Sequence, residues 1–479
     1  MGWYSENWSY RQAITVDHTK VGADLTDFPI AVRISDPANP VFSKARSDGH
    51  DLLLTGADGT TKLSHERAVW DQTAKVMVLF FKASSLSSAA DTVFYLYYGN
   101  PASGDQQNGP DVWTNGYRGV YHLDGAPGTV IDSTAGTHNG TSSNMDAGDL
   151  VAGLLGKAHD FDGSNDYVDI PHHADFDPGN AFTVFLCIYQ HTQGWRAPLT
   201  KRSCCDDATL FEWSLQADGG NNRLYWGVRT DTGTKWVTGN VPPLNSWYSG
   251  HGVWEGTQST LYQNGLQTAQ LTGITGTAVA RSGINVKIGA RSHSASPYYG
   301  DCFDGLIDEV RIAQAVRSPG WVLTEHNSTV NNGSFFSLEA EEAQVALSDA
   351  ALSFAAYYQG LDDAPIHLAA FYQAFEDAGL DLGAIHDAML HDATLVLSVL
   401  GQALSDAGLN LRTGKGRLID ARILLSAVSS LVFLDAGICL LATDGILGQD
   451  ARLYLSAVKQ PPTFRASVAQ RLSSILSEV

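Results

Sequence analysis

The chain has 479 residues, which is too long for a single ordinary core and predicts two to four domains. Apolar residues make up 44% of the sequence and charged residues 17%, a composition that is typical of globular proteins and excludes a largely disordered chain. Acidic residues outnumber basic ones by 51 to 30, giving a formal net charge of −21, so no basic face is expected for a nucleic acid or an anionic membrane surface.

The first hundred residues read as short strands separated by clusters of turn residues. Residues 12–16 and 28–34 alternate between apolar and polar side chains, which places every second residue on one face of a strand. Residues 76–81 and 93–98 are continuous apolar runs. This pattern predicts a small β-sandwich over residues 1–108.

Four motifs in this region occur in the order seen in a family of unknown function. They are Trp8-Ser9-Tyr10-Arg11, Asp27-Phe28-Pro29-Ile30, Ser47-Asp48-Gly49-His50-Asp51-Leu52 and Tyr97-Tyr98-Gly99-Asn100-Pro101. Roughly residues 6–105 therefore resemble that family, which commonly precedes laminin-G-like modules in microbial and viral surface proteins. The resemblance implies a β-sandwich and no known chemistry.

Residues 109–336 again read as short strands and turns, and three segments resemble a laminin-G-like, concanavalin A-type jelly roll. The segments lie within residues 120–141, 156–168 and 303–321, and the Asn264-Gly265 pair between them is a hairpin signal. The resemblance implies the fold. It leaves the ligand open, because this fold hosts lectins, enzymes and purely structural modules.

Residues 337–479 contain a repeat. The pattern Asp-Ala-x-(Leu/Ile)-x-(Leu/Phe) occurs eight times, starting at Asp349, Asp363, Asp377, Asp392, Asp406, Asp420, Asp435 and Asp450. The mean step of about 14.4 residues equals four α-helical turns. The third position alternates between Gly and other residues, so the full unit is a 29-residue double repeat.

The repeat predicts an α-helical region, built either as a stacked helix–turn–helix array or as a broken helix in an oligomeric stalk, with the Asp residues as N-caps. Residues 424–442 are apolar enough to suggest a membrane span. Asp435 falls on the repeated Asp position, so a buried helix is favoured over a span. The expected fold is thus mainly β: two β-sandwich domains, the second a concanavalin A-like jelly roll, followed by an α-helical repeat region that forms a homo-oligomer or larger assembly.

No catalytic motif is found in the jelly-roll segment. Glycosidases with this fold carry two carboxylates on one strand as Glu-x-Asp-x-x-Glu. Residues 101–330 contain four glutamates, none of them in that pattern: Glu212, Glu255, Glu309 and Glu325. Nucleophile-elbow, P-loop and zinc-protease motifs are missing as well, so we expect a protein that is not an enzyme.

Calcium is the one cofactor that the sequence predicts. Jelly rolls of the resembled type often bind one Ca²⁺ near the start and end of the module, and the matching segments contain four oxygen-bearing residues: Asp132, Asn139, Asp162 and Asp304. The alternative is that these side chains only hold turns, as Asp162-Gly163 suggests.

Aromatic residues in loops are the candidates for sugar contact. Alternation over residues 223–229 places Trp226 on the core side of a strand, so it is a poor candidate. The predicted ligand-binding residues are Trp195, Tyr298 and Tyr299, with His293 nearby; ordinary loop packing is the alternative. The adjacent pair His172-His173 is expected to lie in a solvated turn.

Five cysteines are too few for a disulfide framework, and buried free thiols are favoured over a Cys205–Cys302 bridge.

The N-terminal residues have no secretory signal pattern. Together these features predict a virion component (fibre, spike or decoration) whose lectin-like module contacts a glycan or host receptor, located on a virion surface or at a cell surface. The alternatives are a secreted or cell-surface microbial adhesin or matrix protein and, less favoured, a polysaccharide hydrolase.

Overall fold

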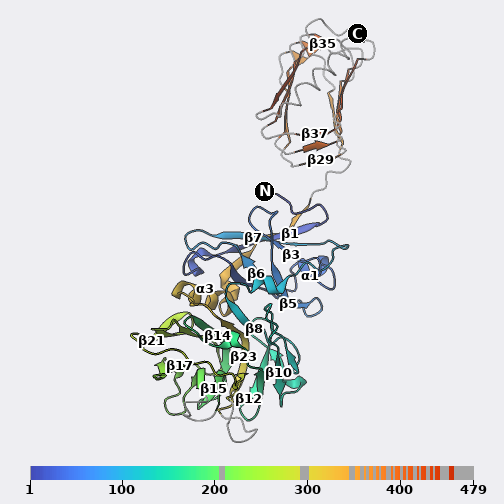
Figure 1. Cartoon of the computed structure of the whole chain (residues 1–479). Coiled ribbons are helices and arrows are strands. Elements are labelled where there is room, and N and C mark those ends of the chain that lie inside the picture. Colours follow the sequence, from blue (N-terminus) through green and yellow to red (C-terminus); the bar gives the residue numbers. More distant parts are fainter. Residues whose placement is uncertain are drawn as a thin grey trace. The chain divides into compact units, whose positions relative to one another are not determined.

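The computed structural model describes residues 2–203, 211–291 and 301–344 with their side chains, and the backbone of a series of strands between residues 351 and 457 (Figure 1). The chain divides into two compact units, Met1–Gln344 and Val345–Val479. The first unit contains two β modules that pack together, and the second contains only strands among its described residues.

The N-terminal module is the predicted β-sandwich. Its first sheet contains, in order, β24 (Phe336–Leu338), β1 (Tyr10–Val16), β7 (Thr92–Tyr98), β3 (Leu53–Thr55) and β4 (Lys62–Leu63); its second contains β2 (Phe28–Ile34), β6 (Val76–Ala83) and β5 (His65–Asp71). Ile14 and Leu96 from the first sheet share one buried cluster with Ile30 and Phe81 from the second. The short helices η1 (His18–Lys20) and α1 (Val41–Lys44) lie in its connections.

The second module is a jelly roll of two large antiparallel sheets. One contains β18 (Gly233–Thr238), β17 (Leu224–Thr230), β16 (Phe211–Ala217), β15 (Arg196–Arg202), β22 (Val286–Ile288), β13 (Tyr167–Ile170), β10 (Gly140–Ser143) and β9 (Thr129–Val130). The other contains β11 (Leu150–Ala152), β12 (Lys157–Asp162), β23 (Asp304–Ala313), β14 (Phe182–Gln190), β19 (Trp247–Trp254), β20 (Ser259–Gln263) and β21 (Leu266–Leu271), with β8 (Tyr117–Tyr121) also on β23. Short helices α2 (Gly109–Val112), η2 (Ala147–Asp149) and η3 (Ala174–Phe176) lie between strands.

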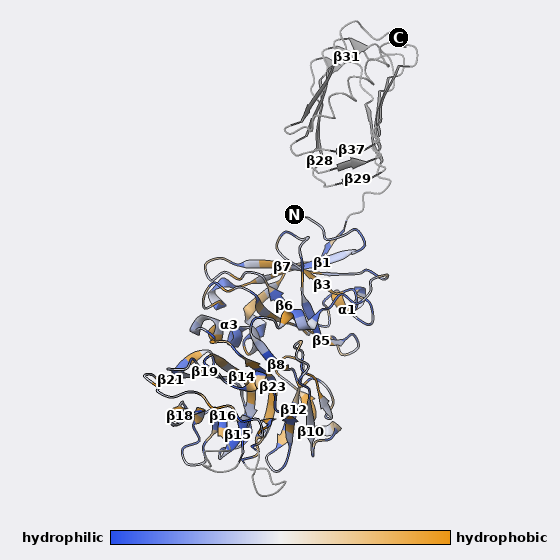
Figure 2. Ribbon diagram, in the orientation of Figure 1, coloured by the Kyte–Doolittle hydropathy of each residue, from blue (hydrophilic) through white to orange (hydrophobic). Residues whose placement is uncertain are grey.

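Hydrophobic and hydrophilic residues both occur along the strands of the jelly roll (Figure 2), and apolar side chains from its two sheets form one buried cluster. Trp213 and Trp226 from one sheet belong to the same buried cluster as Ile188 and Ile312 from the other. Trp226 is fully buried, as the alternation predicted. Cys187 and Cys302 are buried free thiols, whereas Cys205 lies outside the described residues.

Helix α3 (Pro319–Thr329) follows the last strand of the jelly roll and packs on the N-terminal module (Figure 1). It starts with Ser318 as N-cap, whose side chain accepts a hydrogen bond from the backbone N–H of Trp321. The ring of Trp321 contacts that of Phe28 edge-on, with centroids 4.8 Å apart. After α4 (Asn332–Phe335), the chain adds β24 and β25 (Glu342–Ala343) to β1. Residues 336–343 therefore complete a sheet of the N-terminal module.

A series of charged side chains crosses the boundary between the two modules. His122 lies 2.7 Å from Glu309 (Nδ1 to Oε1) and 3.2 Å from Glu66 of β5 (Nε2 to Oε2). Arg311 donates to Glu309 at 2.7 Å and to Glu325 of α3 at 2.8 Å. Glu309, Arg311 and Glu325 are at most 2% exposed, so the ion pairs form away from water.

The ion pairs in this network outweigh the effect of burial on its titratable groups. Burial raises the pKa of Glu325, but the hydrogen bond with His251 and the charge of Arg311 lower that pKa to about 2. Burial lowers the pKa of His122, whereas the charges of Glu309 and Glu66 raise it well above its usual value. Charged forms are therefore the stable forms of these groups at neutral pH.

The described strands of the second unit form four parallel ladders. They are β26 (Ala351–Ala356), β30 (Gly379–Ala384), β34 (Gly408–Thr413) and β38 (Gly437–Ala442); β27 (Leu361–Asp362), β31 (Leu390–His391) and β35 (Leu418–Ile419); β28 (Ile366–Ala370), β32 (Thr394–Val399), β36 (Arg422–Ala427) and β39 (Arg452–Ala457); and β29 (Ala374–Glu376), β33 (Ala403–Ser405) and β37 (Val432–Leu434). Gly379 pairs with Gly408, and Gly408 with Gly437. Successive strands of each ladder thus pair at steps of 28 to 30 residues, which is the register of a parallel β-solenoid.

The described residues between 351 and 457 lie in strands and not in the predicted helices, and these strands pair at spacings of 28 to 30 residues, close to the predicted 29-residue double repeat. The strands form because the Leu-x-Leu part of each repeat alternates with period two, which is a strand signal. The helical prediction relied instead on the 14-residue spacing, which also fits whole helical turns. From Gly379 onward, a strand starts directly after each Asp-Ala pair. The Asp residues predicted as N-caps lie outside the described residues.

The apolar run at residues 424–442 belongs to this unit, and its described parts lie in strands β36, β37 and β38, so the expected buried helix is not formed there. In the part of the chain that the structure describes, none of the helices is both long and apolar enough to cross a bilayer.

Candidate functional site

The loop between β14 and β15 presents an exposed tryptophan. Trp195 is 52% exposed, and it is the only aromatic residue among the large hydrophobic side chains that are exposed in the described part of the chain. Its indole lies against Gly219, where an added Cβ would stand 2.2 Å from Cδ1 of the ring. Gly194, with φ of 127°, makes the preceding bend. The indole therefore packs against glycine backbone, and about half of the surface of Trp195 is accessible to solvent or a ligand.

Polar groups surround this tryptophan. Asn222 donates from its side-chain amide to the amide oxygen of Gln193 at 3.1 Å. The carboxylate of Asp218 accepts from the backbone N–H groups of Asn221 and Asn222, which fixes the turn before β17. An exposed aromatic ring flanked by amides is the arrangement that binds the C–H face and hydroxyl groups of a sugar.

The other predicted sugar-contact residues, His293, Tyr298 and Tyr299, lie outside the described residues. The described residue that follows their segment is Asp301, whose backbone carbonyl accepts from the N–H of Ala197 at 2.8 Å. Ala197 lies two residues after Trp195. Asp301 therefore lies next to the loop that presents Trp195.

The predicted calcium ligands Asp132 and Asn139 close one loop. The side-chain oxygens of Asp132 accept from the N–H groups of Val120, Thr134 and His138 and from the hydroxyl of Thr134. Asn139 accepts from the N–H of Asp132 at 2.9 Å. Four donors fill the lone pairs of the Asp132 carboxylate, so this residue does not fit a calcium ligand.

The other two predicted ligands, Asp162 and Asp304, lie opposite each other on β12 and β23. Asp162 accepts from the N–H groups of Ser164 and Asn165, as a turn-holding side chain does. Asp304 lies 3.8 Å from Arg196 and accepts from the hydroxyl of Thr192. Calcium at these two residues stays a prediction.

The glutamates of the jelly roll do not form an open pair of carboxylates. Glu309 and Glu325 belong to the ionic network between the modules. Glu212 is fully buried and contacts Lys201, which also contacts Asp177 at 2.6 Å. Burial raises the pKa of Glu212 to about 8, but its carboxylate has no exposed surface with which to reach a substrate.

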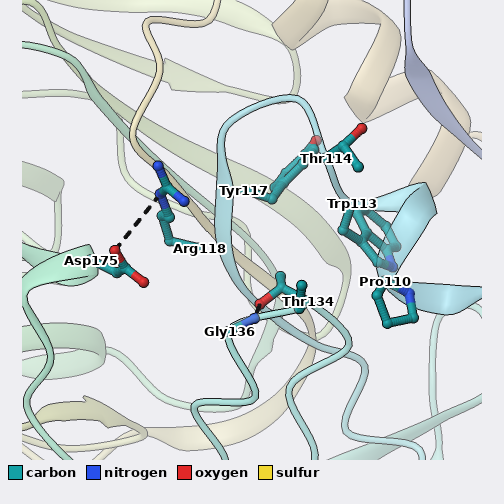
Figure 3. A pocket seen from close by; sticks show the side chains of 9 residues that line it. Pro110, Trp113, Thr114, Tyr117, Arg118, Thr134, Gly136 and Asp175 are labelled. Carbon is teal, nitrogen blue, oxygen red and sulfur yellow. Dashed lines mark hydrogen bonds and ion pairs between the residues drawn. The ribbon is translucent and has the colours of Figure 1, made fainter.

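A pocket of about 230 Å³ lies between α2, β8 and the loop at residues 134–136 (Figure 3). Trp113 and Pro110 line one side, and Arg118 and Asp175 line the other, with the Arg118 guanidinium 4.0 Å from the Asp175 carboxylate. None of the residues that the sequence predicted as ligand contacts lines this pocket. Its walls come from segments far apart in the chain, and no local motif marks them.

Comparisons with known families agree with this architecture. Residues 162–323 match the model of the concanavalin A-like lectin/glucanases superfamily, and residues 48–139 match that of a domain of unknown function, DUF2341. The chain therefore contains a laminin-G-like, concanavalin A-type module preceded by the domain of unknown function that the sequence motifs indicated. No curated protein sequence matches the chain significantly.

Several solved structures resemble part of the chain at low similarity. Domain 4 of AbnA, an extracellular arabinanase from Geobacillus stearothermophilus solved with arabinotriose, is 18% identical with a TM-score of 0.34, covering 44% of this chain and 97% of that domain. The binding domain of Paraclostridial Mosquitocidal Protein 1 is 11% identical with a TM-score of 0.36, covering 45% of this chain and 52% of that one. The binding domain of Botulinum Neurotoxin DC, in complex with SialylT, is 11% identical with a TM-score of 0.32, covering 45% of this chain and 52% of that one. The match thus spans about half of each toxin domain.

Proposed function

We propose that the concanavalin A-like module binds a glycan and that Trp195 is the centre of its contact surface. The observation that carries the proposal is the exposure of this indole, 52%, on a loop where it contacts bare glycine backbone. Exposure of the apolar indole to water is unfavourable, and a ligand with an apolar face would bury this surface and so gain free energy on binding. Gln193 and Asn222 supply amide groups on the two loops that carry Trp195 and Gly219.

The proposal is for binding without bond cleavage. Of the four glutamates in the jelly roll, Glu212, Glu309 and Glu325 are buried in ion pairs, and Glu255 is a single exposed residue. Retaining and inverting glycosidases need two carboxylates about 5–9 Å apart on either side of the bond. Release of reducing sugar by the purified protein would contradict this part of the proposal.

A glycan array identifies the ligand, and a substitution then tests the site. For the best glycan on the array, Trp195→Ala is expected to weaken binding by about 10-fold, since loss of one aromatic stacking contact is worth roughly 1.4 kcal/mol. Leu266→Ala is the matched control, because Leu266 is 64% exposed on the edge strand β21. An affinity that is unchanged by Trp195→Ala would contradict the proposed site.

The wider role that we propose is display at a surface. Among the described residues, the first and last strands of each parallel ladder pair on one side only, and such ladder ends are covered by a cap or by another chain. We therefore infer that residues 345–479 assemble copies of the chain, as a virion fibre, spike or decoration protein requires; a microbial adhesin or matrix protein is the second candidate. Mass photometry of the intact chain is expected to detect oligomers, and a monomer at all concentrations would contradict this role.

A further inference from the structure

Two histidines and an aspartate converge at the pocket of Figure 3, which Asp175 lines. The possible ligand atoms of His138, His173 and Asp175 all lie within 4.8 Å of one another. Nε2 of His138 lies 2.9 Å from Oδ2 of Asp175, and Nδ1 of His173 lies 3.3 Å from the same oxygen. The two imidazole rings have centroids 4.2 Å apart and planes inclined by 31°.

The two nitrogen-to-carboxylate separations, 2.9 and 3.3 Å, are close to those between donor atoms around a tetrahedral metal ion. Donor atoms that bind zinc at about 2.0–2.1 Å lie roughly 3.4 Å from each other along the edges of the tetrahedron. Two imidazole nitrogens with one carboxylate oxygen form a donor set that suits zinc and related transition metals better than calcium. We propose that His138, His173 and Asp175 bind one divalent transition-metal ion, and that Zn²⁺ is the ion that fits them best.

The loop that carries His138 is fixed in place before any ion binds. Asp132 accepts the backbone N–H of His138 at 2.8 Å, and the hydroxyl of Tyr121 donates to the His138 carbonyl at 2.8 Å. The preceding residue, Thr137, has φ of 51°, a conformation that is rare for a β-branched side chain. The surrounding hydrogen bonds thus hold a strained backbone that directs His138 to one place.

The other two ligands are placed by the short helix η3. Asp175 donates its backbone N–H to Nδ1 of His173 at 3.2 Å, so this nitrogen carries a lone pair rather than a proton, as a metal ligand must. A metal ion would replace this long hydrogen bond. Arg118 lies 4.0 Å from Oδ1 of Asp175, whereas both imidazoles are close to Oδ2, so cation and guanidinium use different oxygens.

The site is open to solvent. Asp175 lines the pocket, and the side chain of His173 is 51% exposed. Three protein ligands leave a coordination position that water or a bound molecule completes, in contrast to closed structural zinc sites with four protein ligands. An ion can therefore enter and leave the folded protein.

The test is a calorimetric titration of Zn²⁺ into the full chain after removal of any affinity tag and treatment with EDTA. Saturation at one equivalent is expected, and His138→Ala, His173→Ala and Asp175→Asn should each weaken binding by roughly 10–100-fold. His50→Ala is the control: its ring nitrogens lie near two separate carboxylates, 3.4 Å from Asp48 and 3.6 Å from Asp105.

His173 is the safest variant, because a half-exposed side chain is removed without disturbing the core. Co²⁺ gives a second readout, since its visible absorption bands report imidazole coordination and should be lost in His173→Ala but kept in His50→Ala. A wild-type Zn²⁺ affinity in His173→Ala, or loss of binding in His50→Ala alone, would overturn the proposal.

Discussion

The position of the Trp195 ring depends on Gly219, which has no side chain. The ring occupies the space that a Cβ at Gly219 would fill, 2.2 Å from Cδ1. The sequence predicted Trp195 as a ligand contact from its loop position beside Gly194, and it predicted Trp226 as core from strand alternation. Gly219 was not predicted, because its role arises from a contact between two loops that are 24 residues apart and no local pattern records such a contact.

A substitution at Gly219 tests the orientation of the ring while leaving Trp195 in the chain. Gly219→Ala is expected to displace the indole and to weaken glycan binding by about as much as Trp195→Ala, roughly 10-fold. The affinity is measured by calorimetry with the glycan that the array identifies. Gly220→Ala is the control, since the nearest atom to its added Cβ is 4.0 Å away. Equal affinities of the two glycine variants would refute this account of the ring.

At the scale of elements, helix α3 connects the ion pairs of the jelly roll to the N-terminal module. Glu325 on this helix contacts Arg311 of β23 and His251 of β19. Sequence patterns predicted the strands on both sides, because alternation and apolar runs are local. They did not predict the network, since its members come from five separate elements. For the same reason the cluster of His138, His173 and Asp175 was missed, although His173-Ala174-Asp175 is a short local signal for it.

The network predicts a pH dependence of stability. The pKa of Glu325 is about 2 in the folded chain and 4.5 ordinarily, so its contribution to stability is complete above pH 4.5 and is lost as the pH falls to 2. This shift corresponds to about 3 kcal/mol of the free energy of unfolding. Glu325→Gln is expected to cost about 3–5 kcal/mol at neutral pH, because Arg311 loses a buried partner, and to flatten the acid dependence.

Tryptophan fluorescence during urea denaturation measures this effect. All 11 tryptophans lie in residues 1–344, so the signal reports the first unit alone. Glu255→Gln is the control, since Glu255 is exposed. If Glu325→Gln keeps the wild-type stability and the wild-type slope between pH 4.5 and pH 2, the network does not stabilise the fold as described.

At the scale of the whole molecule, the chain combines a two-module β unit with a parallel solenoid. The period of the C-terminal repeat could be predicted from the sequence, because Asp-Ala recurs at fixed steps. The type of structure could not be predicted from that period, since 14.4 residues fit four helical turns and also half of a 29-residue solenoid turn. The strand pairings distinguish the two, as in the pairing of Gly379 with Gly408 and of Gly408 with Gly437.

Deletions test the solenoid. Removing residues 379–407, one whole unit, brings Gly408 to the place of Gly379 and is expected to keep the hydrogen-exchange protection of the remaining strands. Removing residues 379–393, half a unit, brings Thr394 there instead and places unlike strands in one ladder. Protection of the following strands should then be lost. Equal protection after both deletions would favour the 14-residue helical unit over the solenoid.

The central claim is that the jelly roll binds a glycan at Trp195, and an NMR titration tests it most directly. The indole N–H signals of the protein are followed while the glycan from the array is added, with the Trp195 signal assigned by its loss in Trp195→Ala. The account predicts that the Trp195 signal moves further than those of the buried Trp213 and Trp226. A saturating glycan that leaves the Trp195 signal in place while other signals shift would contradict it.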